Sequence, residues 1–213
     1  MVLNKDGSFQ RTARFRGPDL DSATQGELIA TTARLNNALR RLGSGWALFV
    51  EAERQSAADY PHSDFPEPLS WLVDEERRAA FEESGNHYES SYHLTLAYLP
   101  PEESRARAAK LLYEHAPGDG VDWRGRLDAF LAETDRVFDL LDGVMPEIVW
   151  LDDAATLTYL HATVSTRRYR LAVPEVPFHL DALLADSALV GGLAPMLGDQ
   201  HLRVVSVLSL IHI

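Results

Sequence analysis

The stretch HYESSYHLTLAYLPP, residues 87–101, has the clearest strand pattern in the chain and is the best guide to its fold. Successive side chains of a strand point to opposite faces, so a strand here has one largely apolar and one polar face. The apolar face carries Tyr88, Tyr92, Leu94, Leu96 and Tyr98. The polar face carries His93 and Thr95. Two prolines end the strand, because proline has no N–H to give to a sheet.

Strand and helix patterns mix on both sides of this stretch. We expect strands over 8–16, 45–54 and 201–207, helices over about 24–42, 69–84, 103–116, 122–142 and 152–165, and short strands and turns over 166–200. The apolar first half of 45–54 favours a central, buried strand. The mixture predicts an α+β fold, a mixed sheet with packed helices and a helical subdomain at about 100–165.

Several boundaries carry recognisable capping chemistry. Thr24 with Glu27, or Ser22 with Gln25, has the spacing of a capping box at a helix start. The helix that follows is expected to end at Gly43. Asp152 or Asp153 is expected to cap the helix over 152–165, and Gly85 to end the helix over 69–84.

The composition is that of an acidic globular protein. Its 213 residues carry 32 acidic and 20 basic side chains, a net charge of -12, which disfavours a nucleic-acid surface because phosphates need clustered cations. The chain has no cysteine, so disulfides and thiolate chemistry are excluded. No stretch approaches the roughly 18 apolar residues that span a bilayer, and the first ten residues do not resemble a signal peptide.

The sequence lacks the common nucleotide-binding and metal-binding motifs. The two lysines, Lys5 and Lys110, both lie outside a Gly-Lys-Ser/Thr context, so there is no Walker A motif for a nucleotide phosphate. The eight histidines show no metal-binding spacing. We therefore expect no catalytic residue, cofactor or metal in this chain.

One pair of short motifs leaves an alternative open. His93-Leu94-Thr95 and His161-Ala162-Thr163 resemble the two motifs of two-histidine phosphoesterases, whose histidines act as general base and acid while the threonines hold phosphate oxygens. His93 and Thr95 point to one face of a strand, as this chemistry needs. The second pair falls in an expected helix, where positions i and i+2 diverge by about 200°.

A much longer resemblance covers nearly the whole chain. VLNKDGSFQRTARFRGPDLDSATQGELIATTARLNNALRRLGSGWALFVEAER, residues 2–54, resembles the N-terminal region of the VirB/TrbE/CagE family of type IV secretion ATPases, closest to the TrbE branch. Supporting pieces follow in the same order, at 60–81, 87–101, 157–165 and 180–207.

The resemblance implies a cytoplasmic subunit, peripheral to the bacterial inner membrane, that works in conjugal transfer. In that family the N-terminal region is non-catalytic and docks on inner-membrane components and neighbouring subunits. A C-terminal RecA-like motor binds ATP and Mg, and the parent is a homo-oligomer. We expect residues 1–207 to be the N-terminal domain without this motor, and hence no enzyme by itself. A stand-alone adaptor protein is the remaining alternative.

Docking candidates come from the aromatic and arginine residues of the first long strand, because these residue types are frequent at interfaces. They are Phe9, Arg11, Arg14, Phe15 and Arg16. The alternative is that both phenylalanines belong to the core and the arginines only solubilise the strand. If a preceding strand is missing, this strand is also expected to have an unpaired edge.

The last six residues, LSLIHI over 208–213, do not continue the family pattern. They equal the translation of a transposase end sequence used in sequencing adapters. We therefore expect 208–213 to be a non-native tail.

Overall fold

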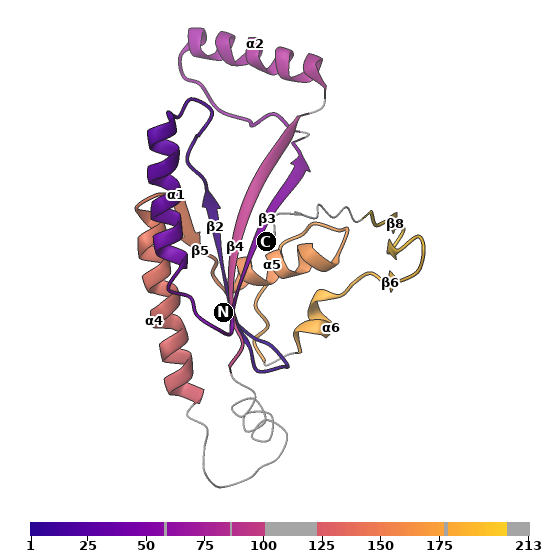
Figure 1. The fold of residues 1–213 in the computed structure, drawn as a ribbon. Coiled ribbons are helices and arrows are strands. Elements are labelled where there is room, and N and C mark those ends of the chain that lie inside the picture. The colour runs from indigo at the N-terminus through magenta and orange to yellow at the C-terminus, as the bar shows by residue number, and fades with distance from the viewer. Residues whose placement is uncertain (58, 86, 101–122, 177–178, 204–213) are drawn as a thin grey trace. The chain divides into compact units, whose positions relative to one another are not determined.

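The computed structural model describes residues 1–57, 59–85, 87–100, 123–176 and 179–203 (Figure 1). The chain divides into two compact units, Val2–Trp150 and, with Met1, Leu151–Ile213. The boundary lies inside the range 100–165 for which we expected a helical subdomain. The helix expected at 103–116 and the tail at 208–213 lie outside the described residues.

A five-stranded sheet forms the centre of the larger unit. Its strands are β1 (Val2–Leu3), β2 (Phe9–Arg16), β3 (Trp46–Ser56), β4 (Tyr88–Tyr98) and β5 (Glu147–Trp150). The order is β1-β2-β4-β3, β5 lies beside β2, and every described pairing is antiparallel. The stretch with the clearest strand pattern is thus the central strand β4. The expected α+β class is confirmed, but the sheet is antiparallel among its described strands rather than mixed as expected.

The strand positions correct two expectations. Strand β2 has no long unpaired edge, because β4 pairs along one side while β1 and β5 share the other. Strand β3 was expected to be central, but among the described residues it pairs only with β4 and forms an edge of the sheet. The apolar run in β3 therefore does not reflect burial on both sides.

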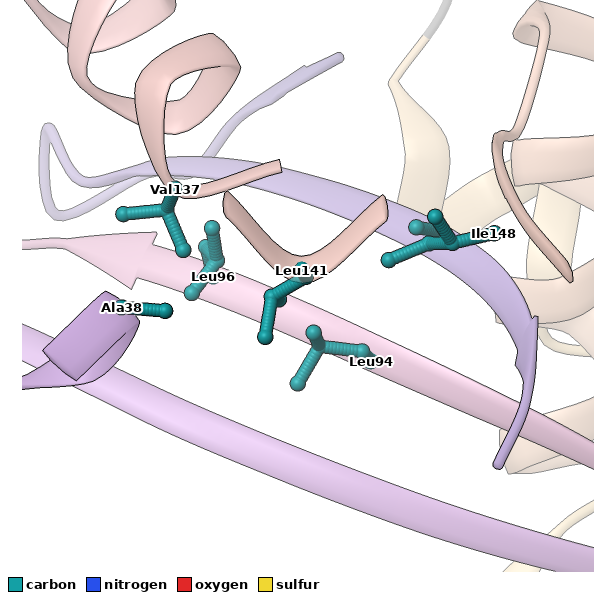
Figure 2. Packing of buried hydrophobic residues seen from close by; sticks show 7 residues of the cluster. Ala38, Leu94, Leu96, Val137, Leu141 and Ile148 are labelled. Atoms are coloured by element: carbon teal, nitrogen blue, oxygen red, sulfur yellow. The ribbon is translucent and has the colours of Figure 1, made fainter. Parts of the chain in front are cut away.

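Two helices supply the apolar partners of the sheet, α1 (Gln25–Leu39) and α4 (Trp123–Asp142). Helix α4 buries Phe130, Val137 and Leu141, whose helical spacing in the sequence places them on one stripe. Figure 2 shows Val137 and Leu141 packed over the apolar face of β4. The buried core consists of Ala13, Ala38, Leu94, Leu96, Val137, Leu141 and Ile148.

Aromatic rings extend this core toward the end of the sheet where β2 and β3 begin. Phe130 stacks on Phe9 with ring centroids 5.4 Å apart and on Trp46 at 5.6 Å. Trp46 in turn contacts Tyr98 at 5.0 Å. One ring of α4 thereby connects β2 and β3, which are not neighbours in the sheet.

Local chemistry fixes the start of α1 and the turn into β3. The Thr24–Glu27 capping box is present, and the alternative with Ser22 is not used. The helix ends at Leu39, earlier than the expected Gly43. The turn into β3 depends instead on Gly45, whose φ is +89°; a Cβ there would lie 2.6 Å from the Leu99 carbonyl oxygen. Only glycine tolerates both the close approach and the positive φ.

The smaller unit contains helices α5 (Asp153–Val164) and α6 (Leu180–Leu184) and three short strands. The strands are β6 (Leu189–Val190), β7 (Met196–Leu197) and β8 (Gln200–His201), paired in that order. Asp152 caps α5, accepting from the Ala155 N–H at 2.7 Å. Of the strand expected over 201–207, the described part holds only the end of β8.

Candidate docking surfaces

Three of the predicted docking residues pack inside the larger unit. Phe9 is buried against Phe130, and Phe15 packs on the core. Arg11 lies directly opposite Leu96 of β4, so its side chain projects to the side covered by α4. These positions agree with the alternative that the phenylalanines belong to the core.

The guanidinium of Arg11 connects β2, α4 and β5. It donates to Thr134 Oγ1 at 3.1 Å and to Asp135 Oδ1 at 2.5 Å, both on α4. Its central carbon lies 3.9 Å from the ring centroid of Trp150. Arg11 therefore has a structural role that the strand pattern alone did not reveal.

Arg14 and Arg16 lie on exposed positions of β2. Arg14 forms an ion pair with Glu147 of β5, its Nη2 lying 2.8 Å from the carboxylate oxygen. Such an exposed pair adds little stability and leaves the arginine available to a partner. Docking through these two arginines stays a prediction.

The first histidine motif lies at the centre of the sheet. His93 and Thr95 are buried, so this part of the polar face of β4 is not exposed to solvent. Thr95 and Thr12 of β2 share a hydrogen bond of 2.9 Å between their hydroxyl oxygens. Burial lowers the pKa of His93; Glu51 and Glu53 oppose this shift and Arg14 adds to it. The imidazole is therefore neutral at pH 7.

The second histidine motif lies on α5 of the smaller unit. His161 is fully buried and donates from Nδ1 to the Leu184 carbonyl oxygen, 2.9 Å away. Its ring packs against Tyr169 at 4.4 Å. Thr163 is exposed and its hydroxyl bonds to the Leu160 carbonyl oxygen. His161 and Thr163 thus face different surroundings, as helix geometry predicts, and present no common phosphate site.

Strand β3 carries exposed apolar residues that its sequence pattern did not reveal. Leu48, Phe49 and Val50 are consecutive and exposed, the last two at 58% and 62%. Their register opposite Leu96, Thr95 and Leu94 places them on alternating faces. The outer edge of β3 has no neighbour among the described strands. An added strand could therefore form hydrogen bonds with the backbone of this edge and contact the apolar side chains of the run on both faces.

The described part of the chain shows neither a metal centre nor a helix that could span a membrane. No cluster of three or more histidine, aspartate or glutamate side chains there is arranged to hold a metal ion. Within the same part of the chain, none of the helices has the length and apolarity to cross a membrane.

Comparison with known proteins identifies the class to which this fold belongs. Residues 1–106 match the family described as type IV secretion system ATPase VirB4/TrbE, N-terminal domain. The chain belongs to this family, which confirms the resemblance found in the sequence.

The relatives point to the TrbE branch. The chain is 40% identical over 114 residues to the first portion of a probable conjugal transfer protein TrbE of Sinorhizobium fredii (strain NBRC 101917 / NGR234), a match that covers 52% of this chain and 76% of the relative. It is 30% identical over 226 residues to the conjugal transfer protein TrbE of Rhizobium radiobacter, covering 97% of this chain. It spans only 27% of the length of that second relative.

Proposed function

We propose that this chain is the assembly and coupling domain of a conjugative type IV secretion ATPase. It would dock the motor to inner-membrane components and neighbouring subunits, on the cytoplasmic side of the inner membrane. ATP and Mg would bind to the motor of a longer, homo-oligomeric parent, and the 213-residue chain would not hydrolyse ATP.

One observation carries this proposal. A chain of the VirB4/TrbE N-terminal family presents an exposed apolar run on β3, whose outer edge pairs with no other described strand. Strand edges of this kind commonly bind an extended segment of a partner, because the backbone supplies hydrogen bonds while alternate side chains enter pockets. In an isolated protein, an edge with three exposed apolar residues promotes aggregation. In an assembly, the same edge can bind a partner.

The test uses the purified chain and inner-membrane vesicles from two matched strains, one carrying the conjugal transfer system and one lacking it. We expect the chain to sediment only with vesicles from the first strain. Phe49→Ser in β3 should reduce this binding about tenfold or more. Leu28→Ser, at a similarly apolar exposed position of α1, is the matched control and should bind normally.

Equal binding to both kinds of vesicle would contradict the docking role. ATP hydrolysis by the purified chain, abolished by a point substitution within it, would contradict the proposal that only the motor hydrolyses ATP. The stand-alone adaptor is distinguished by reading the DNA downstream, where an in-frame Walker A motif is expected.

A further inference from the structure

Helix α2 (Pro68–Ser84) turns the side that carries Asp74, Arg78 and Phe81 toward Tyr60 and His87 of the segments on either side of it. Asp74 is the buried residue of this helix, and it accepts a hydrogen bond from the Tyr60 hydroxyl at 2.7 Å. Arg78 lies one turn on, with its Nη2 3.6 Å from the other Asp74 oxygen. Phe81 completes this side, because its ring contacts Tyr60 and stacks on His87 at 3.6 Å.

The apolar stripe of α2 points to solvent instead. Leu69, Leu72 and Val73 have the i, i+3, i+4 spacing that a globular helix normally turns to its core. They are 73%, 50% and 42% exposed. Ala80, on the same stripe two turns later, is exposed as well. The hydrogen bond that Asp74 accepts from Tyr60 supports this orientation, since rotating the helix would break that bond and expose Phe81.

The charges of α2 indicate what covers the stripe. Helix α2 carries five carboxylate side chains and only two guanidinium groups. Glu76 and Glu83 lie seven and fourteen residues after Leu69, so they continue its stripe toward the C-terminus. The stripe is therefore apolar at its start and acidic further on. An anionic membrane surface would repel it, because such surfaces attract clusters of lysine and arginine.

A second copy of the chain fits the stripe poorly. Antiparallel pairing of two α2 helices along all 17 residues places Glu76 of one copy against Glu76 of the other. The same pairing sets Leu69 against Glu83. Like charges at the centre and apolar groups against carboxylates both oppose this dimer.

We propose that α2 docks by its outward stripe into a groove of another protein, with an apolar floor for Leu69, Leu72 and Val73 and basic side chains where Glu76 and Glu83 lie. Binding of an amphipathic helix in a groove is a common recognition mode, read through anchors at this spacing. The inference rests on the proposed assembly role, and it adds the surface and the chemistry of the partner.

The test measures binding of the 213-residue chain to each purified subunit encoded by the same transfer operon. For one subunit we expect Leu72→Ala to raise the dissociation constant at least tenfold. Glu76→Lys should raise it similarly and weaken its dependence on salt. The matched control is Ile29→Ala on α1, which is 63% exposed and should leave the dissociation constant unchanged. Circular dichroism should show all variants folded alike, since these side chains are exposed.

The failures of the two proposals are distinguishable. If a subunit binds normally but ignores Leu72→Ala and Glu76→Lys, the groove is overturned and the assembly role stands. If no subunit binds the unmodified chain, both are overturned. A dimer in sedimentation that Leu72→Ala dissolves, or binding to phosphatidylglycerol vesicles lost in Leu72→Ala, would replace the partner groove with a second copy or a membrane.

Discussion

Replacing Arg11 with methionine separates a structural from a docking role for the arginines of β2. Methionine keeps most of the apolar stem but removes the hydrogen bonds to Thr134 and Asp135 and the contact with Trp150. A cation–π contact contributes about 0.5–1 kcal/mol at an exposed site and about 2 kcal/mol when desolvated. An ion pair with a half-exposed carboxylate adds about 0.2–1 kcal/mol. We therefore expect the free energy of unfolding to fall by about 1–2 kcal/mol.

Urea unfolding measures this loss, with Arg16→Met as the matched control at the exposed end of the same strand. The control should change the free energy of unfolding by less than about 0.5 kcal/mol, as surface substitutions usually do. If Arg11→Met is as stable as the control, the contacts of Arg11 are not stabilising and its assignment to the core side is refuted. Reduced binding to transfer subunits without loss of stability would return Arg11 to the docking candidates.

The remaining predictions concern two local structures. Gly45→Ala should destabilise the chain by about 1–3 kcal/mol in urea unfolding, because alanine meets both a positive φ and the Leu99 carbonyl oxygen, whereas Gly43→Ala should cost less, having open space around it. The Thr24 backbone N–H, helped by its hydroxyl, holds the pKa of the Glu27 carboxyl below its usual value. That stabilisation is complete above the unfolded pKa of about 4.3 and is lost as pH falls through the lower folded pKa. The stability difference between the chain and Glu27→Gln should therefore shrink between pH 6 and pH 2, and an unchanged difference would contradict the capping role.

Local patterns predicted the elements well where one face is buried against one partner. The alternation in β4, the stripe of α4 and the capping at Thr24 and Asp152 all depend on neighbours within a few residues. Their chemistry is complete in the local sequence, so the structure reproduces them.

Position in the sheet could not be read in the same way. The run Leu48-Phe49-Val50 looks like a buried central strand, yet which edge of β3 is paired depends on β4, some forty residues away. Arg11 was equally ambiguous, since its orientation depends on the register with β4 and its partners come from α4 and β5. Periodicity tells which residues share a face, but not what lies against that face.

The exposed apolar surfaces of β3 and α2 share one feature, a glutamate at the midpoint of the element. Full antiparallel self-pairing of β3, which has 11 residues, would place Glu51 directly opposite Glu51 of a second copy. The corresponding pairing of α2 would do the same with Glu76. Each surface thus carries a carboxylate at its midpoint, where self-association would confront like charges. A partner with a cation at that position gains an ion pair from the same residue. This arrangement disfavours aggregation of an acidic chain with itself while keeping both surfaces open to a basic partner.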